Sequence, residues 1–349
     1  MDSVFLKNHL RMPAEWEKQK STWVAWPHNK KDWPNKFENI PYVFAEIISC
    51  ISKVQIVNLL IQNKKSKKKI INYLKQKKAK INNIKIIICK TDRVWVRDSG
   101  PIFLKDKKNN IILSNWNFNA WAKYKNFKND NTINLKISKN KKYKILNIIY
   151  KNKPVTLEGG SIDVNGNGLL LTTKECLLSK IQERNPGLGI KDYTTIFKKI
   201  LGVRKIIWLE KGISGDDTHG HIDDVARFVS KNKVFLAVEN NKKDKNFKNL
   251  KKNLDILNKT IIDKKKLKII KIPMPSPKII EGTRVPATYL NFYIANKIVL
   301  VPVFNDAKDK IVINIFKKNF KSRKIIPINC SELIWGFGAI HCMTQQEPI

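Results

Sequence analysis

The stretch YLNFYIANKIVLVPVFNDAKDKIVINIFKKNFKSRKIIPI, residues 289–328, contains the structural unit that decides the fold. Two apolar runs near its start are separated only by Asn296 and Lys297, which predicts a β-hairpin. A helix candidate and a further apolar run follow the hairpin. We therefore predict strands at Tyr289–Ala295, Ile298–Val303 and Lys324–Ile328, and a helix at Ala307–Phe320 that Asp306 could cap.

The same order of strands, helix and strand recurs about five times along the chain, which predicts α/β units packed side by side or round an axis. No Pro- or Ser-rich linker divides the sequence, so we predict a single domain over residues 1–349. We interpret Lys123–Lys144 as a lysine-rich insertion or surface loop. The other predicted strands are Val54–Ile61, Ile84–Cys89, Ile111–Trp116, Gly168–Thr172, Lys205–Leu209, Val225–Val229, Val234–Val238 and Leu267–Ile272. The other predicted helices are Pro41–Ser52, Ser66–Lys77, Lys191–Leu201 and Asp244–Asp263.

The chain carries 68 Lys and Arg against 29 Asp and Glu, a net charge of +39. Such a charge by itself suggests a nucleic-acid partner. The lysine-rich runs, however, fall between apolar stretches, contain few aromatic residues for base stacking and match no nucleic-acid-binding motif. We interpret them as solvated surfaces of a chain whose Lys, Asn and Ile content reflects A/T-rich codons, and expect at most nonspecific binding of nucleic acid. The runs are Lys64–Lys69, Lys75–Lys80, Lys139–Lys144 and Lys242–Lys252.

Other classes of protein are disfavoured by the same sequence. No stretch approaches the roughly 18 apolar residues of a membrane helix, and the N-terminal residues have no apolar core followed by small residues. We therefore predict a cytoplasmic protein without a membrane partner. The five cysteines are widely spaced and form no CxxC pair, which argues against both a disulfide framework and a zinc knuckle.

Five short segments are unusually polar for their apolar or glycine-rich surroundings, and a closed fold could bring them to one centre. They are VWVRDSGP (94–101), LEGGSID (157–163), GDDTHGHIDD (215–224), EGTRVPATYLNF (281–292) and GFGAIHCMTQQ (336–346).

Two of these segments contribute a carboxylate beside glycine. Asp98 precedes Ser99-Gly100-Pro101 at what we expect to be a strand end, where a carboxylate could accept two hydrogen bonds from a planar cation. Glu158 precedes two glycines, which allow close approach of backbone to a ligand. Each residue alone would also fit an ordinary turn or hairpin.

The segment GDDTHGHIDD is the densest polar cluster. His221 and Asp223 are two residues apart and would face the same side of an extended segment. A histidine beside an acid suits proton transfer near neutral pH. A metal site competes with this interpretation, because HxHxDD resembles the HxHxDH signature of metallo-β-lactamase-like hydrolases. The last position is Asp224 rather than His, so we favour a site without metal.

The last two segments supply an amide and a thiol. Asn291 follows an apolar pair at a predicted strand, and its amide could bind a substrate amine or pair with nearby backbone. Cys342 follows a glycine-rich turn and His341, and it needs a lowered pKa or a cationic substrate to react as thiolate. A buried structural cysteine is the alternative for this residue taken alone.

Taken together, the ordered motifs resemble the agmatine deiminase family, within the pentein-type group of guanidino-modifying enzymes. The resemblance starts at RMPAEWEKQKSTWVAWPH (11–28), continues through the segments above with THGHIDDVARF and YLNFYIAN, and ends at IHCMTQQEP. It implies a five-bladed α/β propeller of ββαβ-type units around a central active-site pocket, with no metal and no organic cofactor. It also implies hydrolysis of agmatine to N-carbamoylputrescine and ammonia in putrescine biosynthesis, by a homo-oligomer.

Roles for individual residues follow from the same resemblance. Cys342 would be the nucleophile that forms a covalent thiouronium, and the distant His221, rather than adjacent His341, would be the general acid and base. Asp98 and Asp223 would bind the guanidinium nitrogens of the substrate. The remaining assignments place Glu158 close by, Trp95 beside the alkyl chain, Asn291 in the substrate pocket and His219 in a structural position.

Several alternatives stay open. Arginine, methylated arginine or peptidyl-arginine could be the substrate, and Arg284, in a motif near the site, keeps these arginine-type substrates open. The family tends to have a run of glycines where this chain has Phe337, which could narrow the pocket. From other classes, a nucleic-acid-binding protein on a degenerate enzyme scaffold and a metal hydrolase remain.

Overall fold

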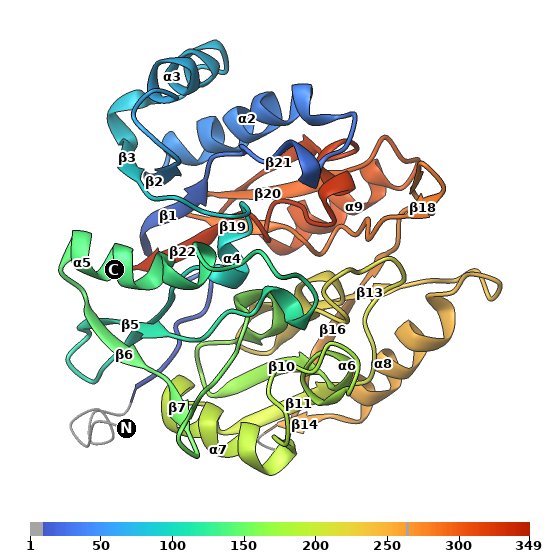
Figure 1. Ribbon diagram of the computed structural model, residues 1–349. Helices are drawn as coiled ribbons and strands as arrows, with labels where there is room; N and C mark the ends of the chain where they lie inside the picture. Colours follow the sequence, from blue (N-terminus) through green and yellow to red (C-terminus); the bar gives the residue numbers. More distant parts are fainter. Residues whose placement is uncertain (1–9, 263–264) are drawn as a thin grey trace.

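The computed structural model describes residues 10–262 and 265–349 (Figure 1). Strands β19 (Tyr293–Ala295) and β20 (Ile298–Val303) form the predicted antiparallel hairpin, with Lys297 at a φ of 66° in the turn. Helix α9 (Asp309–Asn319) then crosses over to β21 (Lys324–Asn329), which pairs parallel to β20. A helical crossover is the usual connection between parallel neighbours, so the sequence unit yields a three-stranded sheet covered by one helix.

This unit recurs in three further sheets of three strands each. In every one, a middle strand pairs antiparallel with the strand before it and parallel with the strand that returns after a helix. The first consists of β4 (Ile102–Lys105), β5 (Ile111–Asn115), α5 (Ile133–Lys141) and β6 (Lys144–Asn147). The second consists of β9 (Asp163–Val164), β10 (Leu169–Thr173), α6 (Lys174–Leu178), α7 (Ile190–Leu201) and β11 (Lys205–Leu209). The third consists of β12 (Ala226–Ser230), β13 (Lys233–Val238), α8 (Phe247–Lys259) and β16 (Lys268–Pro273).

The fifth sheet joins the two ends of the described chain, with strand order β22-β1-β2-β3. Strand β22 near the C-terminus pairs antiparallel with β1, and the Glu347 side chain accepts hydrogen bonds from Ser21 and Trp23 of β1. The segment that carries Cys342 is therefore fixed beside the N-terminal segment. The elements are β1 (Gln19–Ala25), α2 (Ile40–Ser52), β2 (Ile56–Ile61), α3 (Lys67–Gln76), β3 (Ile84–Ile88) and β22 (Gln345–Pro348).

Short two-stranded ribbons and one-turn helices lie within and between these sheet units. The ribbons are β7 (Ile149–Tyr150) with β8 (Lys153–Pro154), β14 (Ile261–Ile262) with β15 (Lys265–Lys266), and β17 (Ile279–Ile280) with β18 (Thr283–Arg284). The turns that matter for the site are α4 (Val96–Ser99), η6 (Gly159–Ser161), η7 (Ile222–Asp224) and η8 (Leu333–Gly336).

Four sequence-based expectations need correction. The Lys123–Lys144 stretch is not simply a surface loop, because it contains α5, whose Ile133 and Ile137 are buried in the core at one-turn spacing. Helix α8 ends at Lys259, whereas the predicted helix ran to residue 263, which lies outside the described residues. The predicted strand from Tyr289 begins only at Tyr293. Asp306 does not cap α9, whose N-cap is Lys308.

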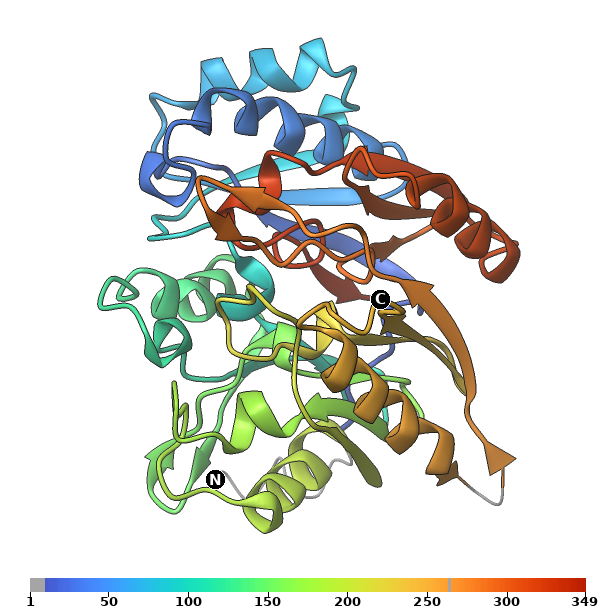
Figure 2. The same ribbon diagram turned by 90° about the vertical axis from the view of Figure 1, so that its right-hand side faces the viewer.

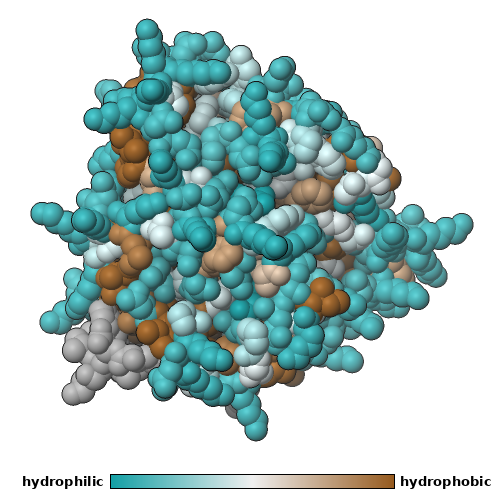
Figure 3. All heavy atoms as spheres, in the orientation of Figure 1, coloured by the Kyte–Doolittle hydropathy of each residue, from teal (hydrophilic) through white to brown (hydrophobic). Residues whose placement is uncertain are grey.

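The longer helices, such as α2, α7, α8 and α9, lie toward the outside in Figure 1 and Figure 2, and the strands of the larger sheets lie inside them. Helices bury one apolar face, as Val312 and Phe316 of α9 show. Phe316 also meets Phe235 of β13, a strand of another sheet, edge-on at 4.9 Å between ring centroids. The lysine-rich runs face solvent, and the face shown in Figure 3 is mostly hydrophilic. Within residues 10–262 and 265–349, no helix combines the length and apolar composition that crossing a membrane requires.

Candidate active site

A cavity of about 400 Å³ brings together residues from distant parts of the chain. Cys342 and Asp98 lie in its wall, and both side chains are almost completely buried. Tryptophan and glycine residues also line the cavity, and most of the remaining lining residues are charged or polar. The lining consists of Asn29, Lys31, Asp32, Pro34, Arg93, Trp95, Asp98, Trp121, Tyr124, Asn126, Asp217, Thr218, Trp335, Gly336, Phe337, Gly338 and Cys342. Three predicted site residues, Trp95, Asp98 and Cys342, therefore share one cavity.

The loop that carries Cys342 is held by the side chain of Asn291. The Asn291 Oδ1 accepts hydrogen bonds from the backbone N–H groups of His341, at 3.0 Å, and Cys342, at 3.2 Å. Its Nδ2 donates to the Cys342 Sγ at 3.1 Å and to Asp224 at 2.9 Å. The amide is thus committed to protein groups, and the geometry does not support the expectation that it binds a substrate amine.

The Cys342 thiol lies among carboxylates. Burial raises its pKa well above the ordinary value, and the nearby charges of Asp223, Asp224 and Asp98 raise it further. The Sγ is 3.9 Å from the Asp223 Oδ2, to which the thiol can donate. The sulfur is therefore protonated until a cation enters and offsets these negative charges.

Asp98 lies in the helical turn α4, not at a strand end as expected. Its Oδ1 accepts a hydrogen bond from the Gly160 N–H at 3.0 Å, and its Oδ2 accepts one from the Trp121 indole at 2.9 Å. Burial raises the pKa of Asp98 to about 6, against the attraction of His221. The carboxylate is thus held by a hydrogen bond at each oxygen, and it takes up a proton at a higher pH than an ordinary Asp does.

Gly160 is the position where the polar side chains converge. A Cβ at this residue would lie 2.6 Å from the His221 Nδ1 and 2.8 Å from the Asp98 Oδ1. Only glycine leaves room for the two groups, which explains the second glycine after Glu158; at the first, Gly159, a Cβ would lie 2.3 Å from the Arg97 backbone oxygen.

Glu158 is completely buried and is paired with Arg184, whose Nε donates to its Oε1 at 3.1 Å. Burial opposes ionisation of this carboxyl, but Arg184 and His221 lower its pKa to about 2. Its Oε2 has no hydrogen-bond partner and lies 3.8 Å from the His221 Nε2. Glu158 is thus a permanent negative charge beside the imidazole.

His221 and Asp223 are brought together by the 3₁₀ turn η7 rather than by an extended segment. The His221 Nδ1 lies 3.8 Å from Asp98 and 3.9 Å from the Asp223 Oδ1. Burial lowers the pKa of His221, yet Asp98 and its other neighbours raise it well above the ordinary value. Neither ring nitrogen has a hydrogen-bond partner. The side chain is buried, however, and His221 is not among the residues that line the cavity.

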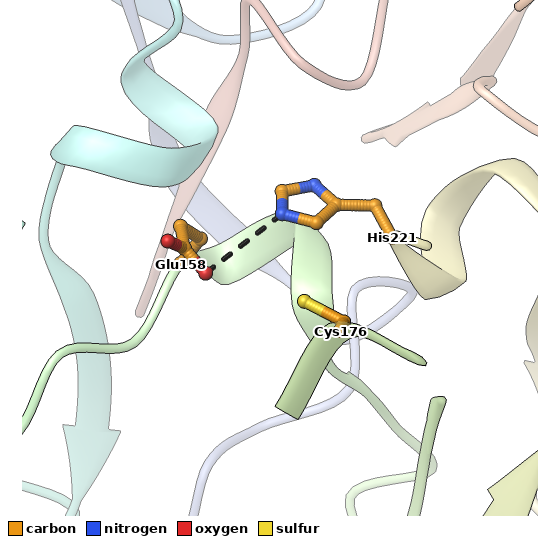
Figure 4. A group of neighbouring side chains, drawn as sticks. All are labelled: Glu158, Cys176 and His221. Carbon is orange, nitrogen blue, oxygen red and sulfur yellow. Dashed lines mark ion pairs between the residues drawn. The ribbon is translucent and has the colours of Figure 1, made fainter. Parts of the chain in front are cut away.

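Glu158, Cys176 and His221 form the cluster of Figure 4 and are the described residues that could hold a metal ion, with one ligand atom of each within 4.8 Å of the others. A thiolate, an imidazole and a carboxylate are suitable ligands for zinc. The Arg184 guanidinium on Glu158, however, already neutralises the only carboxylate of the cluster. The arrangement therefore suits a site in which the ion pair of Glu158 and Arg184 orients the His221 imidazole better than it suits a site that binds a metal cation.

Two further residues singled out from the sequence lie outside the cavity, and a third lines it. Arg284 donates to both Asp244 oxygens at 3.0 Å and does not line the cavity, which corrects the suggestion that it meets a substrate carboxylate. His219 contacts the Ser179 hydroxyl at 3.1 Å and does not line the cavity either, as expected for a residue with a structural role. Phe337 does line the cavity, at a φ of 62°.

Sequence reasoning missed Trp121 and Arg184. Trp121 lies in a turn where Ala120, Trp121 and Ala122 all have positive φ, an unusual backbone for residues other than glycine. Arg184 stands in ERNPG, a polar turn, and the acid with which it pairs, Glu158, lies 26 positions away in the chain. A tryptophan among lysines was the only signal for the first of these residues.

Known proteins resemble this chain over nearly its whole length. The profile of the Porphyromonas-type peptidyl-arginine deiminase family matches residues 11–348. An agmatine deiminase of Pseudomonas aeruginosa is 31% identical over 97% of this chain and 95% of its own. A substrate-bound agmatine deiminase variant of C. jejuni superposes with a TM-score of 0.86 at 31% identity, covering 97% of this chain and 96% of the other. The agmatine deiminase of Enterococcus faecalis gives a TM-score of 0.88 at 29% identity, with the same coverage. The chain is therefore a member of the Porphyromonas-type peptidyl-arginine deiminase family, with a mixed α/β fold.

Proposed function

We propose that this chain is an agmatine deiminase, which hydrolyses agmatine to N-carbamoylputrescine and ammonia. The observation that carries the proposal is a buried thiol, Cys342, in one cavity wall with Asp98, with Asp223, Glu158 and His221 immediately behind. The agmatine deiminases among the similar proteins support the same activity.

The carboxylates suit a guanidinium group. Asp98 and Asp223 carry negative charge in a buried setting, and each could accept charge-assisted hydrogen bonds from guanidinium nitrogens. The Asp223 Oδ1 has no partner within the protein, which leaves it free for the substrate. Burial strengthens these contacts because little water competes for them.

Binding of the cation prepares the nucleophile. The positive guanidinium offsets the charges that raise the pKa of Cys342, so the thiol releases its proton to solvent as substrate binds and takes one back after the product has left. The Asn291 amide then donates to the thiolate. The sulfur attacks the central guanidinium carbon and forms a neutral tetrahedral adduct.

His221 moves the protons of the two half-reactions. As imidazolium, it gives a proton to one nitrogen, which leaves as ammonia and converts the adduct into a cationic S-alkylthiouronium on Cys342. The neutral imidazole then takes a proton from water as the oxygen attacks the same carbon. Collapse of this second adduct expels the thiolate and leaves N-carbamoylputrescine, while the remaining proton converts ammonia into ammonium.

The walls of the cavity suit the aliphatic chain of agmatine. The Trp95 and Trp121 rings line the cavity next to Asp98, and Trp95 packs against Trp33 at 5.6 Å between centroids. Gly338 permits this arrangement, because a Cβ there would lie 2.7 Å from the Trp95 ring.

We extend the proposal to the assembly of the protein. The repeated sheet topology and the pairing of β22 with β1 support a five-bladed α/β propeller around the cavity, formed by a single catalytic domain over residues 1–349. A homo-oligomer in the cytoplasm is proposed by analogy with the family. An experimental structure and the mass in solution test these points.

Substrate profiling tests the function directly. Purified protein is assayed for ammonia and for the carbamoyl product with agmatine, arginine and an arginyl peptide. Agmatine should give the highest kcat/KM, and Cys342→Ser should remove turnover while Cys89→Ser, a matched change at a buried cysteine outside the cavity, should keep it. Turnover by Cys342→Ser would contradict the mechanism.

One observation favours a second candidate, an arginine-type substrate. Arg93 lines the cavity and could meet a substrate carboxylate. It is, however, paired with Asp32 at 2.9 Å and lies over the Tyr124 ring at 4.2 Å, so its charge is already balanced. If arginine is turned over and Arg93→Gln removes that activity selectively, the second candidate is supported.

A further inference from the structure

A buried chain of side chains lies behind Asp223, on the side away from His221. The His341 Nδ1 is 2.6 Å from the Asp223 Oδ2, and the His341 Nε2 is 2.8 Å from the Glu15 Oε2. All three side chains are at least nine-tenths buried. Each of the two contacts needs a proton between a ring nitrogen and a carboxylate oxygen, so the three groups share two protons.

Glu15 is held rigidly and anchors this chain of buried side chains. Its Oε1 accepts the backbone N–H of Ile294 at 2.7 Å, and its Oε2 lies 3.0 Å from Arg227 and 3.3 Å from Arg97. Arg227 in turn pairs with Asp163 at 3.1 Å. The contacts come from β19, β12 and α4, so Glu15 is fixed by several elements at once.

His341 fixes the orientation of the Asp223 carboxylate. Because the Oδ2 is bound to His341, the Oδ1 is left without a partner and points to His221 at 3.9 Å. Rotation of the carboxylate would break a short buried hydrogen bond. The backbone of His341 is held independently, by the Asn291 Oδ1.

We infer that His341, supported by Glu15, is a positioning residue that fixes Asp223 so that its Oδ1 receives the guanidinium. This inference rests on the proposed deiminase function and gives a role to the histidine that adjoins the nucleophile. His341 does not contact the reacting atoms in this account. Its loss therefore acts through Asp223.

Two substitutions of His341 separate positioning from packing. Asn places its amide nitrogen near the position of Nδ1 and keeps a donor for Asp223, whereas Gln places its nitrogen near Nε2 and keeps only the contact with Glu15. We expect His341→Asn to stay within about tenfold of the unmodified kcat/KM. His341→Gln should fall at least about thirtyfold below His341→Asn, mainly through a higher KM, as expected for loss of a hydrogen bond to a buried charge. Equal values for the two variants, or the reverse order, would overturn the inference.

Binding in a Cys342→Ser background separates this inference from the proposed function. Calorimetry with agmatine should show binding by Cys342→Ser and by Cys342→Ser/His341→Asn, and much weaker binding by Cys342→Ser/His341→Gln. If the unmodified chain neither binds nor turns over agmatine, the proposed function fails. If it does both while the two double variants bind equally, only the role of His341 fails.

A measurement that starts from the unmodified protein tests the inference without any substitution of His341. The short contact with Asp223 should give a far-downfield imidazole N–H signal in the proton NMR spectrum. The signal should persist in His221→Asn and disappear in Asp223→Asn. Its absence from the unmodified protein would overturn the inference.

Discussion

Replacing Asp98 by Asn should produce two effects of opposite sign on the reactivity of Cys342. The change keeps the size of a completely buried side chain and removes its charge. Without the charge, the guanidinium loses one charge-assisted hydrogen bond, which corresponds to about 1.5–3 kcal/mol. We therefore expect kcat/KM for agmatine to fall roughly 10- to 150-fold. The same charge raises the pKa of Cys342, so its removal should speed alkylation of the thiol by neutral iodoacetamide.

The stability of Asp98→Asn can be bounded from the same geometry. Folding raises the pKa of Asp98 from 3.8 to about 6, so the protonated form stabilises the fold at low pH and this stabilisation is lost as pH rises through about 6. At pH 7 the carboxylate therefore costs on the order of 3 kcal/mol, which Asn removes. Against this gain, Asn can accept from only one of Trp121 and Gly160, and the unpaired donor costs about 1–3 kcal/mol. The two effects nearly offset, so Tm should change by only a few degrees.

Three measurements check this prediction: steady-state kinetics with agmatine, the iodoacetamide rate constant of Cys342 at fixed pH, and thermal unfolding. Asp244→Asn, at an acid that pairs with Arg284 away from the cavity, is the matched control and should leave kcat/KM unchanged. An unchanged kcat/KM in Asp98→Asn, or slower alkylation together with lower turnover, would refute the reasoning. A merely unfolded variant cannot give lower turnover with an unshifted Tm.

Asn291→Ala should lower kcat about 10- to 100-fold. The Cys342 N–H loses its acceptor and the thiolate loses a donor, whereas the His341 N–H keeps the backbone carbonyl of residue 291. Stopped-flow kinetics would show the loss, and an unchanged kcat would contradict the role of the amide. Trp121→Phe keeps an aromatic ring but removes the indole N–H that donates to Asp98. The KM for agmatine should therefore rise by roughly tenfold with little change in Tm. The control Trp208→Phe, away from the cavity, should leave the KM unchanged. The kcat/KM should fall as pH drops through about 6, because Asp98 takes up a proton. The groups that face Asp98 are His221, Asp223, Glu158 and Trp121. The fall should be absent in Asp98→Asn, and a flat pH profile of the unmodified protein would contradict the assignment.

The recurring sheet unit could be predicted because its signal is local. Strand β11 occupies the predicted residues, and the hairpin of β19 and β20 follows from two residues between apolar runs. Helix α5 escaped prediction because lysines and asparagines surround Ile133 and Ile137, which hides their one-turn spacing in a stretch that reads as solvated. Tertiary burial of those two residues, rather than local propensity, stabilises the helix.

The residues of the candidate site could be named from motifs, but the contacts between them could not. The partners are far apart in the chain: Glu15 and His341 are separated by 326 positions, and Asp223 and His341 by 118. A side chain such as Asn291 has the same chemistry whether it binds substrate or holds a loop, so only the folded chain distinguishes the two roles. The sharp turn that aims Trp121 at Asp98 is likewise invisible in the sequence, since its positive φ values occur at residues other than glycine.

The central claim is that Cys342 forms a covalent bond to the guanidinium carbon of agmatine. Rapid acid quenching of the unmodified protein during turnover, followed by peptide mass spectrometry, tests it most directly. We predict that the peptide containing Cys342 gains the mass of agmatine less ammonia, and that Cys342→Ser shows neither this adduct nor turnover. Steady turnover of agmatine without any adduct on Cys342, or with the adduct on another residue, would contradict the account.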